Sequence, residues 1–523
     1  MSSSPTAKTI SSATPVAVID IGSTSIRMAI AEINSIGVVR TLETLSQAVS
    51  LGRDTFTTGQ IQRNTIENVV RTLRSYRRLI SQYQIEKQEH IRVIGTSAIR
   101  EAGNRLAFLD RIYSATGFDV DAIDEAEENR VTYLGIQPLL QESRLSNGNV
   151  LVMEVGGGHT DLLVVRKGNV VFSHSYRLGS LRIRKTLEAF RTPVTKSRHI
   201  MEGKIQRTIE QVREQVPDQG PIELIGLGGD MRFAAMQIIP DWNPLALGRV
   251  PRVELEALTN QMLELSEDEI VQRYHLSYPE AETIGPALLA YVMMAQAFDV
   301  VSVLVTNTNI RDGLLKEMAN SETWTEDFRT QIVRSAVALA NRYDVDVKHA
   351  KLVANLCQEL FEKLQSEHQL PARYGIILHV AGLLHEIGLF VNSRSHHKHA
   401  MYIIKNSEIF GFGKKQLLLT ALITRYHRRG SPQPKHEDYA DLDRDERIAV
   451  AKLAAILRVA IALSDSRSER IRDVRCKLEK GLMVITVPNV DDLSIEQFAL
   501  QQSGTLFEET FGTQVLLRPH RAK

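Results

Sequence analysis

Residues 150–165 place two carboxylates on either side of a glycine turn. An apolar stretch ends at Glu154, three glycines follow at 156–158, and a second apolar stretch begins at Asp161. Consecutive glycines allow positive φ angles and let backbone N–H groups approach a ligand closely. Carboxylate oxygens are the ligands that hard divalent cations prefer. The segment therefore predicts a site for a phosphate and a divalent cation, and a plain β-hairpin turn is the alternative.

A second turn of this kind lies near the start of the chain. Asp20 ends an apolar stretch, the turn 22–25 reads Gly-Ser-Thr-Ser, and apolar residues resume at Ile26. Hydroxyl and amide groups in such a turn donate hydrogen bonds to phosphate oxygens, while Asp20 suits a metal ion. A third glycine turn, 226–229, also follows an apolar stretch. We therefore expect duplicated halves that face one cleft.

The elements that must position these turns alternate between strand and helix patterns. Strands are expected within 16–33 and at 91–100, 118–123, 150–155, 161–166, 170–175, 222–227 and 301–305, and helices at 59–85, 101–116, 125–141, 182–216 and 252–297. Such alternation favours α/β layers. Helical patterns dominate from about 322 to 465, and the tail predicts a hairpin at 478–487, a helix at 492–508 and a strand at 514–517.

Composition limits the class of protein. A chain of 523 residues is too long for one core, and its net charge of +1 provides no overall attraction for a polyanion. Two cysteines, Cys357 and Cys476, exclude a disulfide framework and a cysteine-based zinc site, so a reducing cytoplasm is expected. We find no membrane-spanning apolar run and no signal-peptide core. Residues 1–15 are rich in Ser and Thr and are expected to be a disordered lead-in.

The motifs taken together resemble the exopolyphosphatase / guanosine pentaphosphate phosphohydrolase (Ppx/GppA) family. They follow one another along residues 16–465 as 20–25, 95–100, 127–135, 154–158, 226–229 and 311–313. The resemblance implies two ribonuclease-H-like domains of the actin-like, acetate-and-sugar-kinase superfamily around a cleft. An all-α HD-type domain and a small C-terminal α+β module would follow. The expected boundaries are 16–140, 141–318, 319–468 and 469–523.

The resemblance also implies an activity. We expect an exopolyphosphatase that releases terminal orthophosphate from inorganic polyphosphate, with Mg²⁺ as cofactor and a glutamate as base. The first alternative is a guanosine pentaphosphate 5′-phosphohydrolase of the stringent response, and the second is a regulator that binds these ligands with weakened turnover. An HD-type phosphodiesterase is a further alternative. A homodimer that binds no nucleic acid is the expected assembly.

Site roles follow from the matched motifs. Glu128 corresponds to the catalytic base, with Glu154 and Asp161 as further catalytic residues; Asp20, Glu154 and Asp161 would hold magnesium. Arg100 is the expected phosphate-contacting arginine, because a planar guanidinium binds phosphate through two hydrogen bonds. The remaining expected phosphate ligands are Gly22, Ser23, Thr24, Ser25, Arg53, Gly156, Gly157, Gly158, His159, Gly228 and Gly229.

The chain departs from the family pattern beside the glycine turns. Glu154 stands where the family usually has Asp, and Asp161 stands where it has Glu. This reciprocal change of side-chain length still permits a magnesium ion between them. His159 replaces a serine, and it either adds a positive charge below about pH 6.5 or blocks the site. Thr24 and Asp230 replace an asparagine and a threonine.

The helical part carries a second set of chemistry-bearing residues. His349, His385, Glu386 and Asp465 fall where an HD phosphohydrolase has its metal ligands, and His399 and His427 are additional candidates. An inherited scaffold without metal is the alternative. A locally basic stripe comprises 396–399, 425, 427–429 and 435. It predicts either a path for a long polyanion or a solvated charged face.

Overall fold

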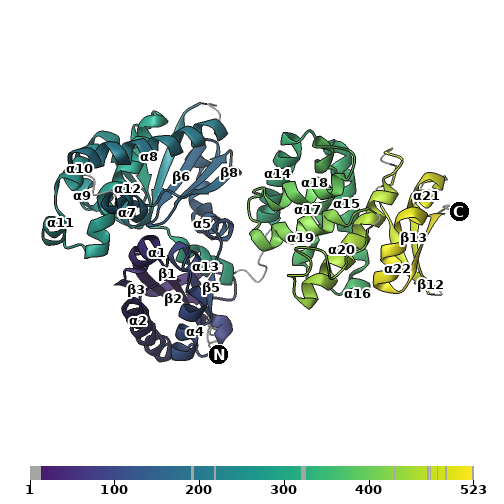
Figure 1. The fold of residues 1–523 in the computed structure, drawn as a ribbon, viewed down its shortest axis with the longest axis horizontal. Helices are drawn as coiled ribbons and strands as arrows, with labels where there is room; N and C mark the ends of the chain where they lie inside the picture. Colours follow the sequence, from purple (N-terminus) through teal and green to yellow (C-terminus); the bar gives the residue numbers. More distant parts are fainter. Residues whose placement is uncertain are drawn as a thin grey trace, which may run out of the picture. The chain divides into compact units, whose positions relative to one another are not determined.

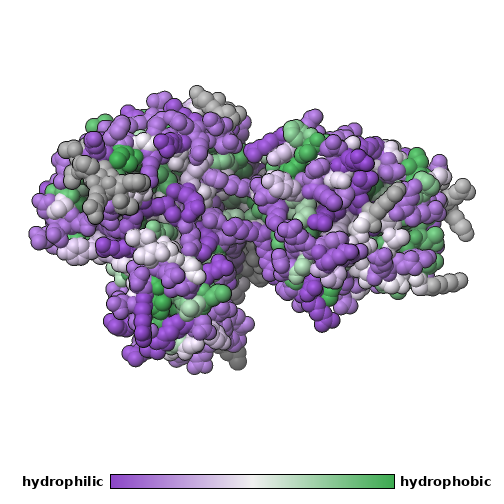
Figure 2. All heavy atoms as spheres, viewed as in Figure 1, coloured by the Kyte–Doolittle hydropathy of each residue, from purple (hydrophilic) through white to green (hydrophobic). Residues whose placement is uncertain are grey.

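The computed structural model divides the chain into two compact units, Met1–Thr323 and Trp324–Lys523 (Figure 1). The structure describes residues 13–189, 194–216, 220–319, 326–428, 430–467, 470–471, 473–479, 481–488, 490 and 492–520. Most of the expected lead-in lies outside these residues. No helix in the described part of the chain is both long and apolar enough to cross a membrane. The visible face of each unit is mainly hydrophilic, with apolar residues in small patches (Figure 2).

The first unit begins with a five-stranded sheet in the order β3-β2-β1-β4-β5. Its strands are β1 (Thr14–Ile21), β2 (Ser25–Ile33), β3 (Val39–Ala48), β4 (Ile91–Gly95) and β5 (Val120–Ala122). Its helices are α1 (Leu51–Thr58), α2 (Arg63–Gln82), η1 (Gln88–His90), α3 (Ser97–Arg100) and α4 (Arg105–Thr116). Alternate residues of β1 enter two different cores, because successive side chains of a strand point to opposite faces. Helices α2 and α4 cover one face, and α13 (Ile310–Ala319) covers the other.

The second sheet has six strands in the order β10-β11-β9-β6-β7-β8. Its strands are β6 (Asn149–Val155), β7 (Thr160–Arg166), β8 (Asn169–Tyr176), β9 (Ile222–Leu227), β10 (Gly248–Pro251) and β11 (Ser302–Val305). Its helices are α5 (Glu125–Leu140), α6 (Ser143–Ser146), α7 (Ser180–Ala189), α8 (Val194–Gln215), α9 (Gly228–Ile238), α10 (Arg252–Glu264), α11 (Glu267–Tyr274) and α12 (Tyr278–Ala297). One core cluster joins the sheet to α8, α10 and α12.

The two sheets repeat one topology. In each, the first strand pairs antiparallel with the second, the second pairs antiparallel with the third, and the first pairs in parallel with a later strand. A further parallel strand follows, β5 in the first sheet and β11 in the second. The edge strand β10 has no counterpart in the first sheet. The duplication expected from the glycine turns is therefore confirmed.

Helices α5 and α13 pack so closely that one position requires glycine. A Cβ atom added to Gly313 would lie 1.9 Å from the carbonyl oxygen of Val131, and one added to Gly135 would lie 3.2 Å from that of Asn309. Beside this crossing, the Arg130 guanidinium contacts Glu317 at 2.6 Å. The 311–313 motif thus has a packing role at the helix that covers the first sheet.

The second unit is helical and ends in a small sheet. Its helices are α14 (Glu326–Arg342), α15 (Val347–Lys363), α16 (Gln365–His368), α17 (Arg373–Leu384), η2 (Ile387–Phe390), α18 (His396–Lys405), α19 (Lys414–Arg425) and α20 (Arg444–Leu463). The tail forms the sheet β12-β13-β14, from Arg475–Glu479, Leu482–Pro488 and Gln514–His520, with α21 (Ser494–Ser503) and α22 (Thr505–Phe511).

Most expected elements are present, with three differences. The expected strand 91–100 ends at Gly95, and Ser97–Arg100 forms one helical turn. Strand β3 carries mostly exposed and half-exposed side chains, and β10 is only four residues long, so neither produced a clear apolar pattern. The finer domain boundaries and the HD type of the helical part remain predictions.

We predict that Gly313→Ala lowers the free energy of unfolding by about 2 kcal/mol, because the new methyl group overlaps the Val131 carbonyl. Urea denaturation followed by circular dichroism measures the change. Gly203→Ala is the matched control, because nothing lies within 4 Å of a Cβ atom at this position in α8. Alanine is favoured over glycine inside a helix by about 1 kcal/mol, so this control should be at least as stable as wild type. Equal stability of the two variants would contradict the packing role.

Candidate active site

A cavity of about 160 Å³ opens at the two glycine turns of the first unit. Both sheets contribute to its lining, together with α5, α9, α12 and the start of α13. The predicted residues that line it are Asp20, Gly22, Ser23, Thr24, Ser25, Glu128, Glu154, Gly156, Gly157, His159, Asp161, Gly228 and Gly229. The tertiary structure therefore brings together residues that are up to about 200 positions apart in the chain.

The glycines at 156–158 are required for close approach and not for positive φ. Positive φ angles occur at nine described glycines, and none of the three is among them. A Cβ atom on Gly158 would lie 2.5 Å from the Phe56 ring and 2.7 Å from the Ser97 hydroxyl. A Cβ atom on Gly157 would lie 3.0 Å from that of Ser23. The predicted backbone conformation is thus wrong for this turn, although Gly228 does have a φ of 90°.

Helix α7 fixes the turn from its other side. The Ser180 N–H donates to the carbonyl of Gly156 at 3.0 Å, and the Arg182 N–H donates to that of Gly157 at 3.1 Å. The Arg182 guanidinium also donates to the carbonyl of Gly158 at 3.0 Å. Because the carbonyls are held by α7, the turn keeps one conformation.

Glu154 and Asp161 face each other across β6 and β7. They are directly paired in the strand register, so their side chains emerge on the same face. The Ser175 hydroxyl donates to Asp161, and the Asn129 amide donates to Ser175 at 3.2 Å, which connects the pair to α5. Burial raises the pKa of both carboxyl groups, that of Asp161 to about 7. The site therefore holds negative charge that a cation would stabilise.

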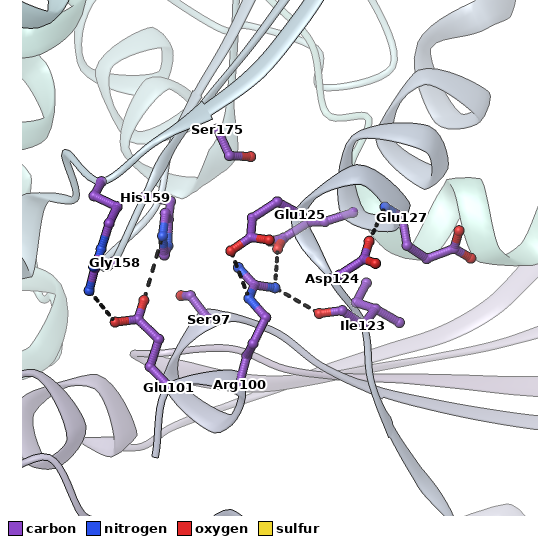
Figure 3. Close-up of polar contacts among 12 residues, drawn as sticks. Ser97, Arg100, Glu101, Ile123, Asp124, Glu125, Glu127, Gly158, His159 and Ser175 are labelled. Carbon is purple, nitrogen blue, oxygen red and sulfur yellow. Dashed lines mark hydrogen bonds and ion pairs between the residues drawn. The ribbon is translucent and has the colours of Figure 1, made fainter. Parts of the chain in front are cut away.

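Glu128 approaches this pair from the first turn of α5. The helix begins at the side chain of Asp124, which accepts a hydrogen bond from the Glu127 N–H at 2.9 Å (Figure 3). Burial and the neighbouring Asp161 and Glu154 raise the pKa of Glu128 well above its usual value. A carboxylate of raised pKa that lines a cavity has the properties of a general base.

Arg100 lies behind Glu128 and does not line the cavity. Its guanidinium donates to the carbonyl of Ile123 at 2.7 Å and contacts Glu128 at 3.3 Å and Glu125 at 3.2 Å (Figure 3). These contacts hold the Glu128 carboxylate in place. The predicted phosphate contact of Arg100 remains a prediction.

Two further predicted phosphate ligands do not line the cavity. Arg53 is exposed on α1, and Gly158 has its carbonyl turned to Arg182. The structure therefore does not place Arg53 with the other predicted phosphate ligands.

Three arginines that the sequence reasoning did not assign lie at the other side of the site. Arg311 contacts Asp20 at 3.6 Å, and Arg27 pairs with Asp20 in the register of β1 and β2. Arg232 is close enough to Glu154 for its charge to oppose the rise that burial causes in the pKa of that carboxyl. The internal duplication could have indicated Arg27 from the sequence. Arg27 pairs with Asp20 in the first hairpin in the same way as Asp161 pairs with Glu154 in the second.

His159 is buried and neutral at physiological pH. Burial lowers the pKa of its imidazole to about 4, although the nearby Glu101 opposes the shift. Its Nε2 lies 3.5 Å from Glu101, whose carboxylate also binds Arg182 (Figure 3). Burial therefore disfavours the positive charge expected below about pH 6.5, and the other expectation, that His159 blocks the site, stays a prediction. His159 lines the cavity as an uncharged side chain.

The carboxylates suit magnesium by donor type. Asp20, Glu154 and Asp161 all line the cavity, and oxygen is the ligand magnesium prefers. Within the described residues, they do not form a group whose ligand atoms all lie within 4.8 Å of one another. Magnesium commonly takes one or two carboxylates and completes its shell with water and substrate phosphates, so the arrangement fits such an ion. Asp230, with its pKa raised to about 7 by burial, adds another carboxyl group to the lining.

In the helical unit, three of the four predicted ligands come together. His349, His385 and Glu386 have ligand atoms within 4.8 Å of one another. Asp465 is exposed and is not part of this group. Position 429 of the predicted basic stripe lies outside the described residues.

Comparison with known proteins gives matches along both units. The model of the Ppx/GppA phosphatase family matches residues 29–322, and that of Ppx/GppA phosphatase domain III matches residues 333–502. A guanosine-5′-triphosphate,3′-diphosphate pyrophosphatase of Aeromonas hydrophila is 25% identical over 90% of this chain and 92% of its own length. The protein of the same name from Photobacterium profundum is 22% identical over 94% of this chain and 95% of its own.

A solved structure shows the same fold over part of this chain. An exopolyphosphatase from Cytophaga hutchinsonii superposes with a TM-score of 0.53 at 21% identity, covering 58% of this chain and 98% of that one. At this identity the likeness concerns the fold alone.

We predict that Asp161→Asn stabilises the protein more at pH 8 than at pH 5. The folded-state pKa of about 7 exceeds the usual 3.8, so ionisation of this carboxyl opposes folding as pH rises between these values. Removing the ionisable group should therefore raise the free energy of unfolding by about 2 kcal/mol more at pH 8 than at pH 5. Urea denaturation at both pH values measures this difference. The exposed Asp110→Asn serves as control, and the same pH-independent effect in both variants would refute the assignment.

Proposed function

This chain belongs to the Ppx/GppA phosphatase family, and on that premise we propose that it releases terminal orthophosphate from inorganic polyphosphate or guanosine pentaphosphate. The family predicted from the sequence motifs is confirmed, and with it the class of phosphoanhydride hydrolases. The observation that carries the proposal is the position of Glu128, which lines one cavity with the glycine turn and with two further carboxylates.

Glu128 is proposed to take a proton from the attacking water. Its raised pKa makes it a stronger base than an exposed glutamate, and Arg100 holds its orientation. As the water oxygen bonds to the terminal phosphorus, the bond from this phosphorus to the bridging oxygen breaks. The shortened substrate leaves with the bridging oxygen, and the terminal phosphoryl group is released as orthophosphate. Arg100 therefore acts in this proposal as a positioning residue.

The two turns are proposed to bind the phosphate oxygens. Gly157 of this turn lines the same cavity as Ser23 and Thr24, and the proposed donors are its N–H group and their hydroxyl groups. Donors held in place before the reaction stabilise charge on a phosphoryl group without having to reorganise. A magnesium ion held by Glu154 and Asp161, with Asp20 nearby, would neutralise further charge on these oxygens.

Two observations concern the choice of substrate. The polyphosphate proposal requires only the polar part of the cavity. Phe233, Leu276 and Ile284 form an apolar part of the lining and pack in one core cluster. Such a surface suits a nucleobase, and the relatives that span nearly the whole chain carry a guanosine substrate in their names. Guanosine pentaphosphate is therefore the second candidate, supported about equally.

The cytoplasmic location expected from the two cysteines and the homodimer that the resemblance implies stay predictions.

We predict that Glu128→Gln lowers kcat for orthophosphate release by about 100- to 10,000-fold, because glutamine keeps the shape of the side chain but cannot accept the proton. Phosphate release with magnesium, from long-chain polyphosphate and from guanosine pentaphosphate, measures the effect.

Glu125→Gln is the control for this substitution. Glu125 also contacts Arg100, at 3.2 Å, but does not line the cavity, so its loss should lower kcat less than tenfold. Equal rates in wild type and Glu128→Gln would refute the base assignment. Binding of both ligands without any turnover in wild type would instead support the regulator alternative.

A second substitution tests the substrate. If guanosine pentaphosphate binds with its base on the apolar part of the lining, Phe233→Ala should lower kcat/KM for that substrate by about tenfold and leave polyphosphate hydrolysis unchanged. Phe298→Ala is the control, because this ring packs against the same core without lining the cavity. An equal loss for both substrates would contradict base recognition by this surface.

A further inference from the structure

The helical unit contains a buried group of metal-binding side chains that the proposed reaction does not use. His349, at the start of α15, His385, after the end of α17, and the adjacent Glu386 direct their ligand atoms to one place. His385 is 2% exposed and His349 is 9% exposed. The Nδ1 of His349 is buried and has no hydrogen-bond partner among the described residues.

Three histidines of this region share one orientation of the imidazole ring. In each, Nδ1 lies within hydrogen-bond distance of the backbone carbonyl three residues earlier in the chain. The pairs are His385 with Gly382 at 2.8 Å, His396 with Ser393 at 3.1 Å and His427 with Thr424 at 2.5 Å. A carbonyl accepts only from N–H, so the proton of each neutral ring is on Nδ1 and Nε2 carries a lone pair. This is the tautomer in which metal-ligating histidines are usually held.

Two of these lone pairs face each other. Nε2 of His396 and Nε2 of His427 are 3.1 Å apart, and the ring of His427 stands 5.7 Å from that of His385. With both protons on Nδ1, neither neutral ring can donate to the other, so both Nε2 lone pairs are available to a cation between them. Two nitrogen ligands of one tetrahedral zinc ion lie about 3.4 Å apart, close to this separation.

The carboxylate of Glu386 is held by an arginine that is not part of the group. The Arg467 guanidinium donates to Glu386 at 2.7 Å. One carboxylate oxygen is thereby fixed while the side chain keeps further lone pairs, which is the arrangement that orients metal-ligating carboxylates. Glu386 is 17% exposed, so an ion can reach the group from solvent.

We propose that His349, His385 and Glu386 bind one divalent transition-metal ion of the zinc or manganese type, with the His396–His427 pair supplying adjoining nitrogen donors. Imidazole nitrogens together with one carboxylate favour such ions over magnesium and calcium, which take oxygen ligands. The site is separate from the carboxylate cavity of the first unit. Its ligand set differs from the one expected from the sequence, because Asp465 is exposed and outside the group.

Metal content of the full chain tests the proposal. Chelator-treated protein is dialysed against micromolar zinc or manganese, then against metal-free buffer, and analysed by mass spectrometry of the bound metal. Wild type should retain about one ion per chain and show a higher melting temperature than the metal-free form. His385→Ala and Glu386→Gln should each lower retention at least tenfold.

Two controls keep the outcome interpretable. His399→Ala, on the same helix as His396 but outside the group, should retain the ion, and so should Asp161→Asn in the first unit. Glu386→Gln changes no volume, so loss of the ion with an unchanged melting temperature of the metal-free form excludes unfolding as the cause. Absence of retained metal and of a melting shift in wild type would overturn the proposal, as would full retention by His385→Ala. Loss of the ion in Asp161→Asn alone would place the metal in the first unit and overturn it as well.

Discussion

Glu154, Asp161 and Glu128 are three like-charged groups placed around one cavity, and the first unit is arranged so that they remain there. Paired strands set Glu154 opposite Asp161, while the first turn of α5 brings Glu128 toward both. Burial raises the pKa of all three carboxyl groups, and repulsion from neighbouring carboxylates, Asp20 in the case of Glu154, adds to this rise. The raised pKa values are unfavourable for folding at neutral pH. The dense packing of the glycine turn and the hydrogen bonds from Ser175 and Arg100 oppose this strain. The repulsion among these buried carboxylates also makes the cavity suitable for binding a cation and for a general base.

The two halves share a topology but differ in charge at the equivalent hairpin position. In the second sheet the partner of Glu154 is Asp161, whereas in the first sheet the partner of Asp20 is Arg27. One half therefore provides a pair of carboxylates and the other a carboxylate beside a guanidinium. Arg311 adds a further positive charge near Asp20. A phosphate chain in the cavity would meet carboxylates on one side and Arg27 on the other, so duplication of the fold did not duplicate the chemistry.

In the helical unit, contacts with backbone carbonyls fix the orientation of three histidine rings. The carbonyl three residues back holds Nδ1 of His385, His396 and His427, and this fixes which nitrogen faces inward. The resemblance to HD phosphohydrolases implied that His349, His385 and Glu386 are neighbours, and the structure brings them together. The resemblance also indicated Asp465, which lies beyond the end of α20 and is exposed. The ends of long helices are difficult to place from periodicity, because a shift of one residue turns a side chain by about 100°.

The sequence by itself determined the family, the alternating strands and helices, and the three glycine turns with their acidic neighbours. These features are local: apolar periodicity and short motifs are read within a few residues. Only the tertiary structure shows why glycine is needed in the 156–158 turn. The atoms that exclude a side chain at Gly158 belong to Phe56 and Ser97, which are distant in the sequence. It likewise decided that His159 is uncharged and that Arg27, Arg232 and Arg311 surround the carboxylates. Burial and the charges of distant neighbours set those properties, and neither is encoded in the spacing of residues along the chain.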